Sequence, residues 1–476
     1  MKYSLLYKKP ERDDPSSAVS DLRLDDTLER ICGAGSEYFA EIISYPLTNA
    51  ENIEYRRGIL SDLLADAGLY DRLDKVFGRY DRLRGDWVEM RGGAAPRRPD
   101  RGSAEASLAA AWASVKATSV FPGTLLSFMR DIADAIGDGA KSEGLRRLRD
   151  RCLELSKDGA LTELTAAADK FRGTSPETHG VKLKINTFYD LEKTSAEIAD
   201  VFPLSEKKSR KISVFSKKKP DAAGGETEAD AALLAADAMY HLDCVLSGVT
   251  DRIYSEMYGL SRELCFYRSA LKYAAFLESK GICVYPELRT DGGTEIDSLY
   301  DLRLLAVQDN VVPCDLKLSA DDAGLLIRGE NGAGKTTFLR SVGAAYLMCQ
   351  AGLPIPAKAA ALTPVRGIYS HFSSAEEDFT PGDTAGRFEG EVRAMSDTLS
   401  RAGRGSLILM NEPFQSTEYG EGTRALHGIL TVLPEERIRY LLVTHLTELF
   451  DAADLTAKRL EFDLKKHDYK ILEEPK

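Results

Sequence analysis

The sequence predicts two parts: an all-α part with long helices, followed by an α/β part with a parallel sheet. Three observations lead to this prediction. Apolar residues from Leu242 to Leu277 recur every three or four positions without an intervening proline, which is typical of one long helix. After Pro286, short apolar runs separated by helical sequence are typical of buried parallel strands. One of these runs leads into a glycine-rich loop and then an apolar helix, an order typical of phosphate-binding domains.

Length and composition exclude several classes of protein. At roughly 150 residues per domain, the 476 residues suggest two to four domains. Apolar residues make up 43% and charged residues 29% of the chain, which excludes a disordered, collagenous or mainly coiled-coil protein. The seven cysteines include no Cys-x-x-Cys pair, so neither a disulfide framework nor a zinc site is predicted.

The start of the chain is polar, and no uninterrupted apolar run of about 18 residues occurs in the sequence. We therefore predict a soluble, reduced, cytoplasmic protein without a membrane segment. The 63 basic and 75 acidic side chains give a net charge of −12, so the surface as a whole does not attract phosphate backbones. Contact with nucleic acid would need local basic patches.

Residues 1–287 are predicted to form the helical part, interrupted by loops near residues 91–104 and 203–231. If about 50 residues of the long helix are helical, it spans roughly 75 Å at 1.5 Å per residue, long enough to act as a lever. The second loop is first basic and then acidic, and it fits either a solvated linker or a loop that contacts phosphates. Its basic residues, which are the candidate DNA contacts, are Lys207, Lys208, Arg210, Lys211, Lys217, Lys218 and Lys219.

Residues 288–476 are predicted to form the α/β domain. Its expected strands are residues 324–328, 406–410 and 439–444. The loop after the first strand matches the pattern Gly-x-x-x-x-Gly-Lys-Ser/Thr in full. The candidate nucleotide-binding residues are Gly329, Glu330, Asn331, Gly332, Ala333, Gly334, Lys335, Thr336 and Thr337.

The chemistry of this loop predicts binding of ATP and Mg²⁺. Its glycines let backbone N–H groups wrap around phosphates, and the start of the following helix adds a partial positive charge. Lys335 should reach the β and γ phosphates, and the Thr336 hydroxyl should hold Mg²⁺.

The second expected strand is followed by Asn411 and Glu412, where a site of this kind needs carboxylates. Asn411 can accept a hydrogen bond from Thr336 or from a metal-bound water, but it brings no charge to Mg²⁺. We count it as a metal residue whose neutrality predicts slow turnover. Glu412 would orient or deprotonate the attacking water, or it is a plain carboxylate at the sheet edge. His445 follows the third expected strand and is either a γ-phosphate sensor or a structural histidine. Its place at a strand end, after the phosphate loop and Glu412 in the sequence, favours the sensor.

The order of these motifs resembles the ABC class of ATPases and, more narrowly, the MutS mismatch-repair family. The resemblance covers roughly residues 25–465, and it is closest in the second domain. The segments similar to the family are Tyr45–Arg57, Leu277–Pro286, Val312–Asp315, Asn411–Thr417 and Thr444–Leu449.

The resemblance implies an α/β P-loop ATPase domain of the ABC type, preceded by an all-α core and lever domain. In this family ATP binds between two paired ATPase domains, so a homodimer through the ATPase domain is expected. The signature segment that completes the partner's site matches Gly386, Arg387, Phe388 and Glu389 here. A serine of the family pattern is missing, so Arg387 is either a substitute phosphate contact or a surface arginine.

Few residues precede Tyr45, so the resemblance implies a short MutS-like protein without the mismatch-reading domain. ATP binding and slow hydrolysis would pair the ATPase domains and move the lever in DNA repair or recombination. The DNA would be structured or branched, not a mismatch that the protein reads directly. The alternative is an ATP-gated protein-interaction switch that does not bind DNA, and salt-dependent DNA binding discriminates between the two.

Overall fold

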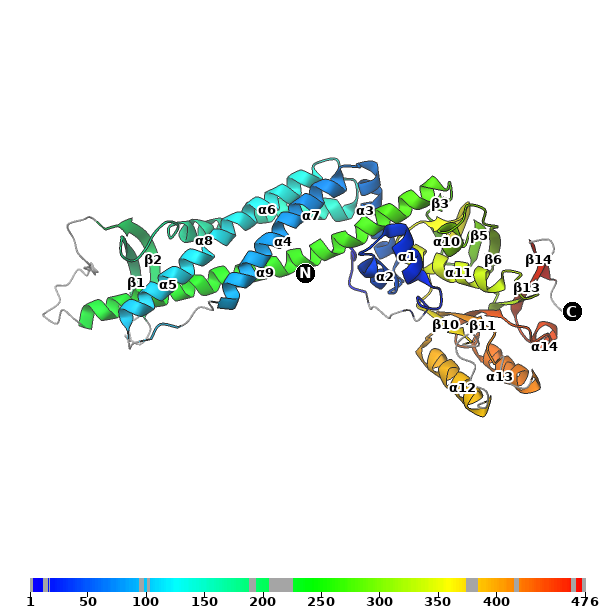
Figure 1. The fold of residues 1–476 in the computed structure, drawn as a ribbon. Coiled ribbons are helices and arrows are strands. Elements are labelled where there is room, and N and C mark those ends of the chain that lie inside the picture. Colours follow the sequence, from blue (N-terminus) through cyan, green and yellow to red (C-terminus); the bar gives the residue numbers. More distant parts are fainter. Residues whose placement is uncertain are drawn as a thin grey trace. The chain divides into compact units, whose positions relative to one another are not determined.

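The computed structural model describes residues 3–11, 16, 18–93, 98–100, 103–187, 194–204, 226–373, 384–414, 419–463 and 468–472 (Figure 1). The chain folds into two compact units. The first unit consists of Met1–Tyr3, Asp66–Lys141 and Leu145–Arg262. The second unit consists of Ser4–Ala65, Ser142–Gly144 and Glu263–Lys476.

The division into these two units therefore differs from the single boundary predicted near residue 288. The segment Ser4–Ala65 joins the α/β part because its residues bond to that part. The Leu47 N–H donates to the Gln350 carbonyl at 3.2 Å, and the Gln350 side chain donates back to the Leu47 carbonyl at 2.8 Å. These contacts link residues far apart in the sequence, so the periodicity of each segment does not predict them.

The first unit is built mainly from helices around an aromatic core. Tyr80 stacks on Phe128 with ring centroids 4.8 Å apart, and Trp87 lies edge-on to Phe121 at 4.7 Å. The Trp87 indole N–H donates to Asp251 at 2.7 Å. The helices are α4 (Leu69–Gly93), α5 (Ala104–Thr118), α6 (Val120–Ile136), most of α7 (Glu143–Ser156), α8 (Gly159–Asp169) and α9 (Glu226–Ser279) as far as Arg262.

The long helix predicted from the apolar spacing is confirmed as α9, which has 54 residues. Within it, Ala229–Ser279 is apolar and long enough to cross a membrane, by length and composition alone. This is weak support for a membrane segment, because core helices share these properties. Asp243 in this helix is fully buried and accepts hydrogen bonds from Ser114 Oγ at 2.7 Å and Thr118 Oγ1 at 2.6 Å. The helix therefore contributes polar as well as apolar contacts to the first unit.

The prediction that the amino-terminal part is all-α is wrong at one place. An antiparallel hairpin forms from β1 (His179–Thr187) and β2 (Thr194–Pro203). The hairpin forms because its strands have an apolar face and a polar face. Val181 and Val201 pack toward a core cluster that contains Trp112, while Lys182 and Lys184 are exposed. The predicted loop at 203–231 overlaps β2 at Pro203 and α9 from Glu226 onward, so its bounds were too wide. Residues 205–225, with all seven candidate DNA-contacting residues, lie outside the described residues.

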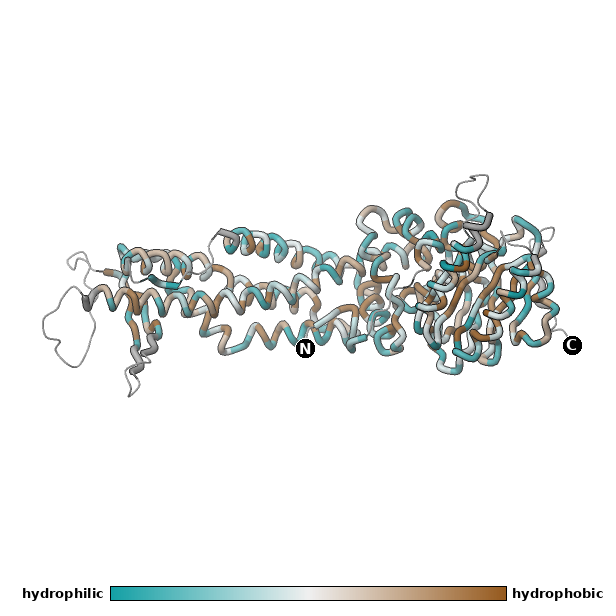
Figure 2. Tube along the Cα trace, turned by 90° about the horizontal axis from the view of Figure 1, so that it is seen from below, coloured by the Kyte–Doolittle hydropathy of each residue, from teal (hydrophilic) through white to brown (hydrophobic). Residues whose placement is uncertain are grey.

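The second unit contains a six-stranded sheet of order β10-β11-β12-β7-β13-β14. Its pairs are parallel except for β13 with β14. The three predicted strands are confirmed as β7, β11 and β12. Figure 2 shows hydrophobic segments through the interior of this unit. The strands are β7 (Gly324–Gly329), β10 (Ile368–Phe372), β11 (Leu407–Asn411), β12 (Arg439–Val443), β13 (Ala457–Asp463) and β14 (Asp468–Leu472).

Helix α11 (Lys335–Gln350) starts directly after the glycine-rich loop and is almost entirely buried from Phe338 onward. It contacts β7, β10, β11 and β12, so the sheet holds the start of this helix in place. The other helices of the unit are α1 (Leu24–Cys32), α2 (Glu37–Ile43), α3 (Ala50–Ala65), α10 (Leu302–Leu305), α12 (Thr384–Arg401), α13 (Tyr419–Val432) and α14 (Glu448–Asp451). The smaller sheets comprise β3 (Cys283–Val284), β4 (Glu287–Leu288), β5 (Thr294–Leu299), β6 (Cys314–Leu318), β8 (Ile355–Pro356) and β9 (Ala359–Leu362).

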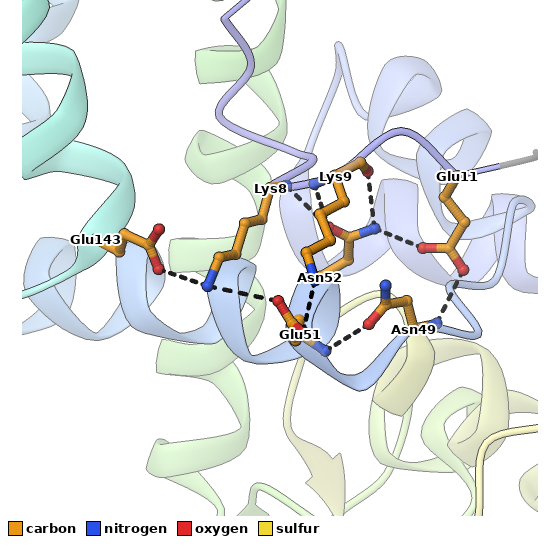
Figure 3. Close-up of polar contacts among 7 residues, drawn as sticks. All are labelled: Lys8, Lys9, Glu11, Asn49, Glu51, Asn52 and Glu143. Carbon is orange, nitrogen blue, oxygen red and sulfur yellow. Dashed lines mark hydrogen bonds and ion pairs between the residues drawn. The ribbon is translucent and has the colours of Figure 1, made fainter.

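An amino-terminal clasp, formed by Lys8, Lys9 and Glu11 around Asn52, closes over the start of α3 (Figure 3). Asn52 is fully buried, and its Oδ1 accepts the N–H groups of Lys8 at 2.8 Å and Lys9 at 3.0 Å. Its Nδ2 donates to the Lys9 carbonyl at 3.1 Å and to Glu11 Oε2 at 2.7 Å. The Lys8 ammonium also pairs with Glu143 at 2.9 Å. The clasp thus ties the amino-terminal segment to α3 and to Glu143, all within the second unit.

Burial raises the pKa of Glu11, but hydrogen bonds from Thr48, Asn52 and the Asn49 N–H outweigh burial and leave the pKa below its usual value. Since the folded carboxyl has the lower pKa, its stabilisation is fully present above the ordinary carboxyl pKa. That stabilisation is lost as the pH falls through the lowered value.

Asn52→Ala is expected to lower the free energy of unfolding by about 2 to 4 kcal/mol, because it removes hydrogen bonds that each contribute about 1 kcal/mol. Urea unfolding followed by circular dichroism measures this change. Glu51→Gln is the control, since Glu51 is 48% exposed and an exposed ion pair contributes about 0 to 1 kcal/mol. Equal losses in the two variants would mean that the buried amide contributes no more than a surface pair.

Candidate nucleotide-binding site

The glycine-rich loop connects β7 to α11, and three of its glycines adopt positive φ angles. The φ values are 149° at Gly329, 82° at Gly332 and 99° at Gly334. A Cβ at Gly329 would lie 2.7 Å from the carbonyl oxygen of Phe462 on β13, so both the backbone angle and the space require glycine there. At Gly332 and Gly334 the surrounding space is open, and only the backbone conformation favours glycine.

The loop and the start of α11 form a donor set that fits a polyphosphate. The first N–H groups of an α-helix have no partner within the helix, and they carry the positive end of its dipole. Gly334 precedes α11, and the exposed Asn331 and Gly332 leave the loop accessible. A turn from the Ala333 N–H to the Glu330 carbonyl at 3.2 Å fixes the shape of the loop.

Lys335, the first residue of α11, is 7% exposed, and its ammonium group lies within the loop. Its Nζ donates to the Gly329 carbonyl at 2.6 Å and to the Glu330 carbonyl at 3.1 Å. Hydrogen bonds from a charged donor are stronger than neutral ones. The lysine therefore shapes the loop and places a positive charge where the loop would receive phosphates.

Thr336 and Asn411 come from neighbouring elements and meet through one hydrogen bond. The Thr336 hydroxyl donates to Asn411 Oδ1 at 2.9 Å, which is one of the contacts that the sequence suggested for Asn411. The pair offers two hard oxygen atoms, the kind of ligand that Mg²⁺ prefers, but neither side chain carries a charge. The donor set thus fits Mg²⁺ with a neutral residue in place of a carboxylate.

Glu412 follows Asn411 in a turn with unusual backbone angles. Its φ is 51°, and Phe414, two residues further on, has a φ of 61°. Residues other than glycine rarely adopt this region, so the surrounding contacts must hold the turn. One such contact is the Glu412 N–H, which donates to the Val443 carbonyl at 2.8 Å.

His445 follows β12 and is exposed. The preceding residue is fixed to the phosphate-loop strand, since the Thr444 N–H donates to the Ile327 carbonyl at 3.1 Å. Because β7, β11 and β12 are parallel neighbours, their carboxyl ends meet at one edge of the sheet. The structure therefore brings Thr336, Asn411, Glu412 and His445 to the same edge, where open α/β sheets bind ligands.

The residues of this arrangement lie in a part of the chain that matches a known family model. The family model MutS domain V matches residues 325–473, which include the phosphate loop from Gly329, Asn411, Glu412 and His445. Residues 325–473 are therefore similar to domain V of the MutS family. Domain V is the ATPase domain of MutS proteins.

Similar MutS relatives match only part of this chain. Endonuclease MutS2 from Pelotomaculum thermopropionicum is 33% identical over 156 residues, covering 33% of this chain and 19% of the relative. Endonuclease MutS2 from an Anaeromyxobacter species is 31% identical over 220 residues, covering 43% and 27%. The mitochondrial DNA mismatch repair protein mutS homolog of Sarcophyton glaucum is 33% identical over 137 residues, covering 29% and 14%. The chain thus spans at most 27% of the length of these three relatives.

The MutS signature segment is placed only in part. The segment lies near the start of α12 and comprises Gly386, Arg387, Phe388 and Glu389. The side chains of Arg387 and Phe388 are not among those that the structure describes. Glu389 is exposed and pairs with Arg393 at 3.0 Å. The role of Arg387 therefore stays a prediction.

Sequence reasoning missed two side chains next to the candidate site residues. Glu391 on α12 accepts a hydrogen bond from the Phe414 N–H, and His371 on β10 lies 3.9 Å from the same carboxylate. The segment containing Glu391 stood out only for its signature pattern. Nothing in the local sequence marked His371.

Proposed function

We propose that this protein is a MutS-like, DNA-associated ATPase that binds ATP and Mg²⁺ and hydrolyses ATP slowly. Nucleotide binding pairs the ATPase domains of a homodimer and moves the lever helices on structured or branched DNA, in DNA repair or recombination. One observation carries the proposal. The phosphate loop, the hydrogen bond from Thr336 to Asn411, and Glu412 share one sheet edge in a region similar to MutS domain V.

In the proposed mechanism, each residue has one task. The N–H groups of the loop and of the first turn of α11 bind phosphate oxygens, and Lys335 reaches the β and γ phosphates. Thr336 and Asn411 hold Mg²⁺ together with water, and bound Mg²⁺ supplies charge that stabilises the phosphoryl oxygens. Glu412 orients the attacking water and accepts its proton, while His445 contacts the γ-phosphate.

Asn411→Asp tests the metal position. Restoring a negative charge should lower the Mg²⁺ concentration for half-maximal ATP hydrolysis about fivefold or more, which corresponds to about 1 kcal/mol for charges about 4 Å apart in water. The hydrolysis rate should also rise, with ATP affinity at saturating Mg²⁺ little changed. Magnesium titrations of the hydrolysis rate measure this.

Asn310→Asp is the matched control, because Asn310 is exposed and the variant changes the net charge equally. An unchanged or higher Mg²⁺ requirement in Asn411→Asp would mean that Asn411 is not a weakened metal position. The site would then have adapted around the amide, and the new carboxylate would be an unpaired charge.

The relatives' names favour DNA as the partner, since they describe MutS2 endonucleases and a DNA mismatch repair protein. The net charge of −12 favours the second candidate, an ATP-gated protein-interaction switch that does not touch DNA. Binding to a four-way DNA junction at several salt concentrations, with and without ATP, separates the two. Log affinity that falls linearly with log salt supports DNA binding.

The basic loop gives a sharper form of this test. Replacing Lys207, Lys208, Arg210, Lys211, Lys217, Lys218 and Lys219 by Ser should weaken junction binding. The salt slope should fall by about 0.9 for each phosphate contact that is lost. A linear duplex of the same length is the control ligand. An unchanged slope would mean that the loop is only a linker.

A further inference from the structure

The turn that presents Glu412 is held from two sides. On the strand side, the Glu412 N–H bonds to the Val443 carbonyl on β12 at 2.8 Å. On the helix side, the Phe414 N–H donates to Glu391 Oε1 on α12 at 2.5 Å. The two residues that donate these bonds, Glu412 and Phe414, both have positive φ angles. Such angles are unfavourable for residues other than glycine, so the turn depends on its anchors.

The Glu391 anchor is a buried, charge-assisted hydrogen bond. The Glu391 side chain is 10% exposed, and a carboxylate that accepts a backbone N–H in such a place forms a strong bond. The Phe414 ring is 3% exposed and belongs to the same core cluster as Met395 of α12. Both the backbone and the ring of Phe414 therefore attach the turn to α12.

His371 approaches the same carboxylate from β10. Its side chain is 6% exposed, and its buried Nε2 lies 3.9 Å from Glu391 Oε1 and forms no hydrogen bond with the residues that the structure describes. His371 lies beside Met410 in the parallel register of β10 with β11, directly before the turn. The Glu391 carboxylate is thus flanked by an imidazole on one strand and by the N–H of the turn.

We propose that Glu391 is a positioning residue that holds the turn Asn411–Phe414 and so sets the place of the Glu412 carboxylate, with His371 limiting the movement of Glu391. This inference rests on the proposed ATPase function. Because Glu391 and the signature segment share α12, a shift of this helix would reach Glu412 through one hydrogen bond. Through this bond, pairing of the ATPase domains at the signature segment would control hydrolysis.

The first test needs no nucleotide. Hydrogen exchange of the Phe414 amide, measured by NMR or mass spectrometry on the full chain, should be about tenfold faster or more in Glu391→Ala, because the amide loses its acceptor. Glu391→Gln keeps an oxygen that accepts this N–H, and its exchange should stay close to the wild-type rate. Asp397→Ala is the control, since Asp397 is an exposed residue of the same helix.

The second test separates catalysis from binding. Glu391→Ala should lower kcat for ATP about tenfold or more and leave KM within about twofold, since it displaces Glu412 and not the phosphate loop. Glu391→Gln should recover most of kcat. If Glu391→Ala fails to fold, Glu391→Asp serves in its place, because the shorter side chain withdraws the acceptor.

Wild-type exchange of the Phe414 amide in Glu391→Ala, or faster exchange with unchanged kcat, would overturn the inference. Neither outcome touches the proposed function, whose ATPase part fails if the wild-type protein itself does not hydrolyse ATP. The exchange measurement still reports on the anchor in that case.

Discussion

Glu412→Gln is expected to lower the rate of ATP hydrolysis about a hundredfold or more, while ATP affinity changes less than about threefold. The amide can accept a hydrogen bond but cannot take a proton from the attacking water. The turn and the loop should keep their form, because the Glu412 N–H bond to Val443 and the Thr336 bond to Asn411 do not use the Glu412 side chain. Phosphate release and calorimetric ATP binding measure the two quantities.

Glu435→Gln provides the matched control, since Glu435 is exposed and lies outside the proposed site. The variant Glu412→Gln should also accumulate as an ATP-bound pair of subunits, visible by size-exclusion chromatography with light scattering. Normal phosphate release by Glu412→Gln would remove this residue from the mechanism. Loss of ATP binding together with hydrolysis would assign it a structural role.

Lys335→Ala is expected to weaken ATP binding about tenfold or more, equivalent to about 1.4 kcal/mol. The variant removes the charge that would contact the β and γ phosphates. It also removes the two hydrogen bonds that join the ammonium to the carbonyls of Gly329 and Glu330, so the loop itself loses support. Calorimetric titration with ATP and Mg²⁺ measures the affinity.

Lys358→Ala controls for the loss of one positive charge, because Lys358 is exposed on the same unit. Thermal unfolding of both variants shows whether the domain stays folded. Equal ATP affinity in wild type and Lys335→Ala would mean that the nucleotide site is assigned to the wrong loop.

Features that depend on local sequence were predictable. The strand before Gly329, the glycine-rich loop and the helix from Lys335 form one continuous segment, and each piece limits the next. The apolar strands that became β11 and β12 are short, uninterrupted runs, which is what strands buried on both faces require. The long α9 followed from its spacing and from the absence of proline.

Features that depend on distant partners were not predictable. Val181 and Leu183 alternate with Lys182 and Lys184, but the hairpin forms only because the two strands meet each other and a helical core. Asn52 reads as an ordinary polar residue of a helix, and its burial depends on the clasp formed by residues far away in the sequence. The contact between Glu391 and the Phe414 N–H likewise needs α12 to pack beside the turn.

The order of the sheet has a consequence for the nascent chain. Strand β7, which carries the phosphate loop, lies between β12 and β13 in the sheet, and both of these strands follow it late in the sequence. During synthesis its apolar residues Leu325 to Ile327 are therefore made long before either neighbour exists. Such unpaired strands fold slowly and expose apolar surface to aggregation. A chain that ends before Arg439 would contain every residue of the phosphate loop and still lack both neighbours of the strand that supports it.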